Sequence, residues 1–155
     1  MFRWVIILFI FLSIPLRANL GESVEQCVKR YGKPIGFSEA NAKAPFGTLV
    51  FAAGKYTLVV FLLETKEVGA RVSKTDKSAF TDAEMKTIMD ADADAQSPWT
   101  STPSTDPGCI EWTRGDKATV LYDKDKHMLI FTTGAMVDAA KGLKPAASAG
   151  PVTPH

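Results

Sequence analysis

Histidine, cysteine and an excess of either charge are what this sequence has least of. The chain of 155 residues contains two histidines and two cysteines, and its 18 basic and 17 acidic residues leave a formal net charge of +1. No basic stripe marks a nucleic-acid-binding surface. A zinc site needs three or four Cys, His or carboxylate ligands at suitable spacing, which two distant cysteines do not supply. We therefore predict no nucleic-acid partner, no metal site and no cofactor.

Patterns that carry catalysis are missing as well. Nucleophilic catalysis needs a nucleophile, a base and an orienting group, and His127 is the one histidine in the region expected to fold. No Gly-x-Ser-x-Gly turn and no glycine-rich phosphate loop is present. Glu64 and Glu67 lie near an expected turn, where we predict solvated charge. We predict that the protein is not an enzyme; the alternative is a small secreted hydrolase or ligand carrier with a pocket near His127.

One acidic run resembles the opening of a calcium loop. Asp90, Asp92 and Asp94 give the spacing D-x-D-x-D, but Ala95 and Ser101 occupy the positions that need a glycine and a bidentate glutamate. We predict a solvated helix end for this run.

The first residues have the layout of a secretory signal peptide. Arg3 supplies the positive charge and Val5–Leu12 is wholly apolar. This apolar run is shorter than the roughly 20 residues that span a membrane, although an uncleaved anchor is the alternative. We predict a signal peptide over 1–18, a single α+β domain over 19–133 and a disordered tail over 134–155. The protein would then be secreted or periplasmic, without stable membrane insertion after cleavage.

Two runs of three strands follow from hydrophobic patterning. The first run is Thr48–Ala52, Tyr56–Glu64 and Val68–Lys74, and the second is Cys109–Arg114, Lys117–Tyr122 and His127–Thr132. The second strand of the first run is apolar at nearly every position, which is typical of a strand covered on both faces. Its successor alternates apolar and polar residues, so we expect it nearer an edge of the sheet.

An amphipathic helix precedes each run of strands. Ser23 opens a capping box before a helix predicted over Val24–Tyr31, and Thr81 opens another before a helix predicted over Asp82–Ala93. The order helix, three strands, helix, three strands predicts an α+β fold. We expect two weakly repeated αβββ units that form an antiparallel sheet, with two short helices packed on one face.

The two cysteines, Cys27 and Cys109, are candidates for a disulfide. A lone pair of cysteines in an exported protein usually forms one bond, which here would tie the first helix to the second run of strands. The alternative is two separate buried thiols, because free cysteine behaves as a small apolar residue.

Two tryptophans are candidates for contact with a partner. Trp99 lies in a polar, proline-rich loop, and Trp112 lies on an alternating strand where a core position is more common. Tryptophan is enriched in binding hot spots, so we predict Trp99 as the candidate partner contact.

A resemblance to known proteins begins at the first helix. The segment Gly21–Pro34, GESVEQCVKRYGKP, resembles the opening helix of small bacterial envelope proteins of the BamE/SmpA type and of the β-lactamase-inhibitor-like (BLIP-like) type. With Phe61–Val68 and Trp112–Ala118, the span from Gly21 to Thr133 is similar to small secreted bacterial proteins of uncharacterised function. BamE lipoproteins carry a lipidated cysteine directly after the signal peptide, whereas Cys27 lies inside the predicted helix.

Together these observations predict an exported, non-catalytic protein. It would be a protein-binding or envelope-associated module whose partner is another envelope or extracellular protein. We expect the contact to use a face of the sheet or the loops around Trp99.

Overall fold

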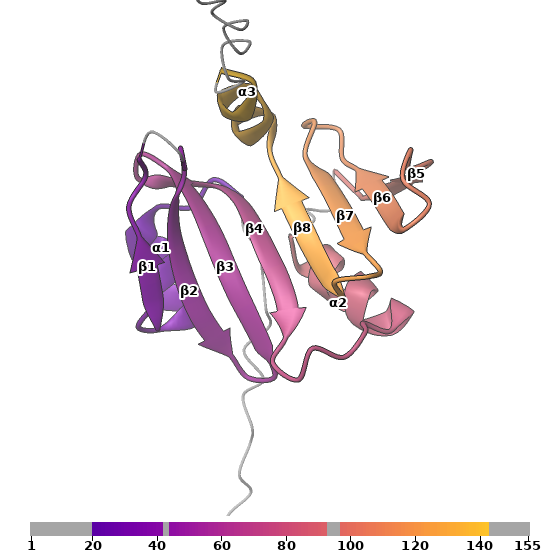
Figure 1. The fold of residues 1–155 in the computed structure, drawn as a ribbon, viewed down its shortest axis with the longest axis horizontal. Coiled ribbons are helices and arrows are strands. Elements are labelled where there is room, and N and C mark those ends of the chain that lie inside the picture. Colours follow the sequence, from indigo (N-terminus) through magenta and orange to yellow (C-terminus); the bar gives the residue numbers. More distant parts are fainter. Residues whose placement is uncertain (1–19, 42–43, 93–96, 143–155) are drawn as a thin grey trace, which may run out of the picture.

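The structure is a computed structural model that describes residues 20–41, 44–92 and 97–142. Within these residues the chain forms one sheet and three helices (Figure 1). The elements in chain order are α1 (Val24–Tyr31), β1 (Gly36–Ser38), β2 (Gly47–Ala53), β3 (Tyr56–Leu63), β4 (Lys66–Lys74), α2 (Asp82–Asp92), β5 (Thr100–Thr102), β6 (Cys109–Thr113), β7 (Thr119–Asp123), β8 (Met128–Thr132) and α3 (Gly134–Gly142). The predicted signal peptide lies outside the described residues.

All the strands belong to a single antiparallel sheet of eight strands, in the order β1-β2-β3-β4-β8-β7-β6-β5. β4 and β8 pair at its centre and join two halves, each of which is a helix followed by four strands. The predicted α+β fold of two αβββ units with two short helices is therefore wrong. The protein is mainly β, each half contributes four strands, and a third helix ends the described chain.

The strands that the sequence did not predict are the two outermost ones. β1 and β5 have three residues each, and each pairs with a neighbour on one side only. They lie in segments rich in glycine, serine, threonine and proline, which predicted loops. A three-residue edge strand has no room for the alternation of apolar and polar residues that identifies longer strands.

α1 and α2 both cover one face of the sheet (Figure 1). α1 lies behind β1 and β2 in this view, and α2 lies behind β8. The helices bury Cys27, Met85, Ile88 and Met89 against the core side chains of the strands. These strand residues are Leu49, Phe51, Leu58, Val60, Leu62, Ala70, Val72, Val120, Tyr122, Leu129 and Phe131.

The other face of the sheet, which we call the open face, is not covered by α1 or α2. This accounts for two incorrect predictions about the strands. Along β3, buried residues alternate with half-buried ones, and Val59 and Phe61 are on the half-buried side. This strand was predicted to be covered on both faces, but the described helices α1 and α2 cover one. The alternation along β4 reflects the same open face, because β4 is a central strand and not one near an edge.

α3 lies in the segment that was predicted as a tail, and it contacts one end of the open face. Its Met136 packs over Gly69 of β4, where a Cβ atom would overlap the methionine sulfur and approach the carbonyl oxygen of Phe131 to 2.7 Å. Thr133 holds the start of this helix by donating its backbone N–H and its hydroxyl to the carbonyl of Val68, at 3.1 and 2.7 Å.

Candidate functional site

A β-bulge in β4 places a glutamate on the helix-covered face. The pairing of β3 with β4 shifts between Phe61 and Leu62, so that Phe61 lies opposite Gly69 and Leu62 lies opposite Glu67. Leu62 belongs to the core, and cross-strand partners share a face. Glu67 therefore points under the sheet, whereas strict alternation from Gly69 would have placed it on the open face. Re-aiming a side chain in this way is a common use of a bulge.

The segment before α1 pairs with the same part of β4. Gly21 donates its N–H to the carbonyl of Glu67 at 3.0 Å, and the N–H of Glu67 donates to the carbonyl of Glu22 at 2.8 Å. An isolated bridge between Ser23 and Lys66 continues this pairing. The backbone thus holds the two glutamates, Glu22 and Glu67, beside each other.

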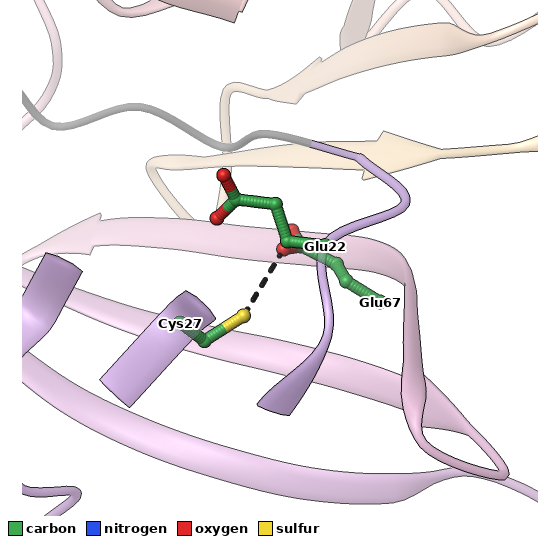
Figure 2. A group of neighbouring side chains, drawn as sticks. All are labelled: Glu22, Cys27 and Glu67. Carbon is green, nitrogen blue, oxygen red and sulfur yellow. Dashed lines mark hydrogen bonds between the residues drawn. The ribbon is translucent and has the colours of Figure 1, made fainter. Parts of the chain in front are cut away.

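α1 adds a thiol to the two carboxyl groups. Ser23 and Gln26 form the predicted capping box, which fixes the first turn of the helix. Cys27 lies one turn into the helix and is fully buried. Its thiol donates to Oε2 of Glu67 at 3.5 Å, as Figure 2 shows.

Glu22, Cys27 and Glu67 form a compact group, the acid–thiol cluster, in which one ligand atom from each residue lies within 4.8 Å of the others (Figure 2). Glu67 is 2 % exposed. Its burial raises the pKa of its carboxyl to about 8, despite the hydrogen bond from the Cys27 thiol. Burial, with the carboxyl of Glu67 close by, also raises the pKa of the thiol to about 12. Both groups are therefore mainly protonated at neutral pH.

Arg30 and Tyr31 complete the surroundings of the cluster. The guanidinium of Arg30 forms an ion pair with Glu22. Burial raises the pKa of Tyr31, and the charges of Glu67 and Glu22 add to this effect. Among the described residues, neither the hydroxyl of Tyr31 nor Oε1 of Glu67 has a hydrogen-bond partner, although both atoms are buried.

An open hollow at the surface adjoins the cluster. It is lined by Glu22 and Arg30, with Gln26 and Lys29 from the outer side of α1. Glu22 therefore belongs both to the acid–thiol cluster and to the lining of this hollow.

The other half of the molecule also buries a carboxylate, at the end of α2. The side chain of Asp92 is 1 % exposed and pairs with Arg114 at 2.8 Å. Burial raises the pKa of Asp92 to about 6, and the charge of Arg114 opposes this rise. The predicted solvated helix end is wrong for Asp92, because Arg114 comes from the β6–β7 turn to pair with it; Asp94 lies outside the described residues.

Trp99, the predicted partner contact, packs beside this ion pair. It is half-buried, its indole N–H donates to the carbonyl of Met89 at 3.0 Å, and its ring meets Phe131 edge to face with centroids 6.2 Å apart. The guanidinium of Arg114 lies 4.7 Å from the ring centroid. These contacts account for the tryptophan as a packing residue that joins the β5 loop to the core.

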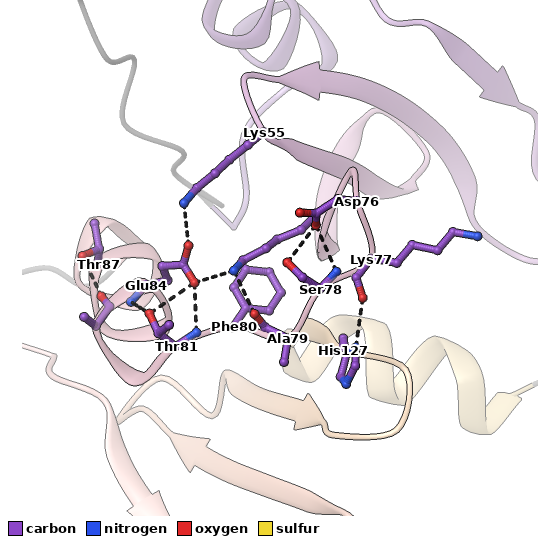
Figure 3. Close-up of polar contacts among 12 residues, drawn as sticks. Lys55, Asp76, Lys77, Ser78, Ala79, Phe80, Thr81, Glu84, Thr87 and His127 are labelled. Carbon is purple, nitrogen blue, oxygen red and sulfur yellow. Dashed lines mark hydrogen bonds and ion pairs between the residues drawn. The ribbon is translucent and has the colours of Figure 1, made fainter.

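His127 is held away from the acid–thiol cluster. Its Nδ1 lies 2.9 Å from the carbonyl oxygen of Lys77 (Figure 3). The hollow described above is lined by residues of α1 and its preceding segment and not by His127. Figure 3 also shows Glu84, which pairs with Lys55 and Lys74 and accepts a hydrogen bond from the backbone N–H of Thr81 at the start of α2.

The structure does not show the predicted disulfide, because Cys27 and Cys109 are both free. Cys27 lies under the helix-covered face. Cys109 of β6 lies opposite Asp123 of β7. It is one position before the core-facing Ile110, so its side chain belongs to the open face. Two cysteines on opposite faces of a sheet, several strands apart, cannot reach the Cβ separation of about 4 Å that a disulfide requires.

The open face carries a continuous row of side chains, which we call the central row. Cross-strand pairing brings its members into line across six strands. They are Val50, Val59, Arg71, Ile130, Leu121 and Glu111. The four apolar members and the glutamate are half-buried, and the arginine is exposed. Small and hydroxyl side chains predominate in the flanking rows, including Thr48, Thr132, Thr119 and Thr113 on one side and Ala52, Thr57 and Ser73 on the other.

Glu67 is the residue that sequence reasoning missed. It was predicted to be solvated because it follows a turn. One signal was available. Its neighbours Val68, Gly69 and Ala70 are small or apolar, and an unbroken run of this kind does not fit the strict alternation expected of a half-exposed strand.

Comparisons with known proteins give limited results. No protein-family model matches the chain, and no curated protein matches it. A cysteine-rich secretory protein from Staphylococcus aureus aligns with a TM-score of 0.43 and 9 % identity, over 77 % of this chain and 46 % of that one. An extracellular protein containing an SCP domain from Bacillus anthracis aligns with a TM-score of 0.44 and 11 % identity, over 88 % and 51 %.

The chain thus spans about half the length of these two solved proteins. The resemblance to BamE-type and inhibitor-type proteins stays a prediction. In the described part of the chain, no helix is long and apolar enough to cross a membrane.

Proposed function

We propose that the protein is an exported, non-catalytic module that binds another envelope or extracellular protein through the open face of its sheet. The observation that carries the proposal is the central row, in which Arg71 lies between two apolar pairs, Val50 with Val59 and Ile130 with Leu121, and Glu111 ends the row. α1 and α2 cover the opposite face, and Met136 of α3 contacts the open face at Gly69.

The chemistry of this surface favours a protein over a small molecule. Protein interfaces combine an apolar centre with a polar rim, and the central row supplies an apolar strip bordered by hydroxyl groups. The row crosses six strands of a sheet, so it presents a broad surface and not the enclosed pocket typical of a small-molecule site. Arg71 favours a partner with a carboxylate opposite the middle of the row.

Affinity capture with paired variants tests the proposal. The tagged full chain is incubated with the secreted and envelope proteins of its source, and retained proteins are compared with those held by Val59→Lys and Ile130→Lys. We expect both variants to keep the far-ultraviolet spectrum of the wild type and to lose at least tenfold in capture, because a charge would be buried in the apolar strip.

Lys86→Glu is the matched control. Lys86 is exposed on α2, so this substitution changes a charge on the opposite side of the sheet. It should retain the partner as the wild type does. The proposal fails if the wild type retains no protein, or if the folded open-face variants retain the same proteins as the wild type.

A further inference from the structure

We propose that Glu22, Cys27 and Glu67 form a binding site for a thiophilic divalent cation such as Zn²⁺. This inference concerns the helix-covered face and is independent of the function proposed for the open face. The three residues come from the segment before α1, from α1 itself and from the bulge of β4, so the cation would join three elements.

The donor set and its spacing suit such a cation. Zinc binds cysteine sulfur at about 2.3 Å and carboxylate oxygen at about 2.0–2.2 Å, so its ligand atoms lie roughly 3.3–3.8 Å apart in a tetrahedron. One ligand atom from each of the three residues lies within 4.8 Å of the others. Coordination would therefore draw the three ligand atoms closer together. A sulfur donor favours Zn²⁺ over Mg²⁺ or Ca²⁺, which prefer oxygen ligands alone.

An unsatisfied polar atom points independently to a missing ligand. Glu67 is 2 % exposed, and its Oε1 has no hydrogen-bond partner among the residues that the structure describes. A buried carboxyl oxygen without a partner is costly whether or not the group is protonated. The bulge of β4 nevertheless turns this side chain inward, toward the thiol of Cys27. A bound cation would supply the partner that Glu67 lacks.

Charge balance supports the same occupant. A thiolate, two carboxylates, a divalent cation and the guanidinium of Arg30 together carry no net charge. Arg30 already pairs with Glu22. Arg30 would then orient a ligand from outside the coordination shell, as hydrogen-bonding partners of metal ligands commonly do.

One member of the site lies next to solvent, because Glu22 lines the surface hollow together with Gln26, Lys29 and Arg30. Metal uptake would release the protons of the thiol and of the Glu67 carboxyl, so binding should strengthen as pH rises.

Titration of the full chain with Co²⁺ and Zn²⁺ tests the site. Cobalt bound to a thiolate gives a ligand-to-metal charge-transfer band in the near ultraviolet, which carboxylates alone do not give. We expect this band in the wild type at a 1:1 ratio, its displacement by Zn²⁺, and a rise in Tm with Zn²⁺. Cys27→Ser should abolish the band, and Glu67→Gln should weaken cobalt binding at least tenfold.

Cys109→Ser is the control, because Cys109 lies on the open face and should leave the band unchanged. Glu67→Gln also guards against a folding defect, since the amide fits the same space and the variant can be checked by its thermal transition without metal. The inference is overturned if the wild type gives no thiolate band, if the band depends on Cys109, or if folded Glu67→Gln binds cobalt as the wild type does.

Discussion

Each half of the molecule buries a carboxylate on the helix-covered side of the sheet, Glu67 in the first half and Asp92 in the second, but the two side chains have different partners. In the second half, Asp92 has a guanidinium 2.8 Å away, and Arg114 also pairs with Asp116 and stacks on Trp99. In the first half, Glu67 has a weak thiol donor and an unpartnered oxygen. The ion pair of Asp92 stabilises the fold, whereas the unpartnered oxygen of Glu67 leaves a position at which a ligand can bind.

We expect the largest loss of stability from Arg114→Ala, in the second half of the molecule. It leaves Asp92 buried without a counter-charge and removes the cation from the face of Trp99, so we expect a loss of about 3–5 kcal/mol in the free energy of unfolding. Urea unfolding followed by tryptophan fluorescence measures the loss. Lys86→Ala is the control, because its pair with Asp90 is exposed and should contribute less than about 0.5 kcal/mol. Equal losses for the two variants would contradict the contrast between the halves.

The difference in stability between Glu67→Gln and the wild type should depend on pH. The pKa of Glu67 is raised from 4.5 to about 8 on folding, so its contribution to stability is fully present below pH 4.5 and is lost as pH rises through 8. In that window the wild type should lose about 1.4 kcal/mol per pH unit relative to the glutamine variant.

The measurement is the difference in free energy of unfolding between Glu67→Gln and the wild type at pH 5, 7 and 9, in the presence of a chelator. The variant should gain on the wild type at each step. A difference that is constant with pH would show that Glu67 keeps an ordinary pKa in the folded protein.

The two helix N-caps should contribute similar amounts to the stability of the two halves. Ser23 and Thr81 each accept a hydrogen bond from the third helical residue, at 3.3 and 3.2 Å. Replacing either by alanine should cost about 1 kcal/mol. Paired thermal unfolding curves of Ser23→Ala and Thr81→Ala measure this. Losses that differ by more than about 1 kcal/mol would show that the capping boxes do not contribute equally.

Sequence patterns predicted the local elements of both halves well. The helix over Val24–Tyr31 is confirmed, and strands β2 to β4 and β6 to β8 form within two residues of the predicted bounds. These elements have strong periodicity and capping signals. The short edge strands and α3 were missed, because their residues carry little periodicity and their pairing depends on neighbours distant in the sequence.

The candidate sites were harder to predict because they arise from tertiary contacts. The inward turn of Glu67 depends on a register shift between β3 and β4, and the run of small or apolar residues after Glu67 does not by itself show where that shift falls. The central row depends on cross-strand register, which a single strand does not reveal. The disulfide prediction followed from the number of cysteines and the expected export of the protein, and it did not take account of the face of the sheet on which Cys109 lies.

The central claim is that the acid–thiol cluster of the first half binds a divalent cation. X-ray absorption spectroscopy of the Zn²⁺-loaded full chain tests it most directly. The account predicts one sulfur at about 2.3 Å from zinc, with oxygen ligands at about 2.0–2.2 Å, and loss of the sulfur in Cys27→Ser. A zinc environment without sulfur, or a sulfur that remains in Cys27→Ser, would contradict it.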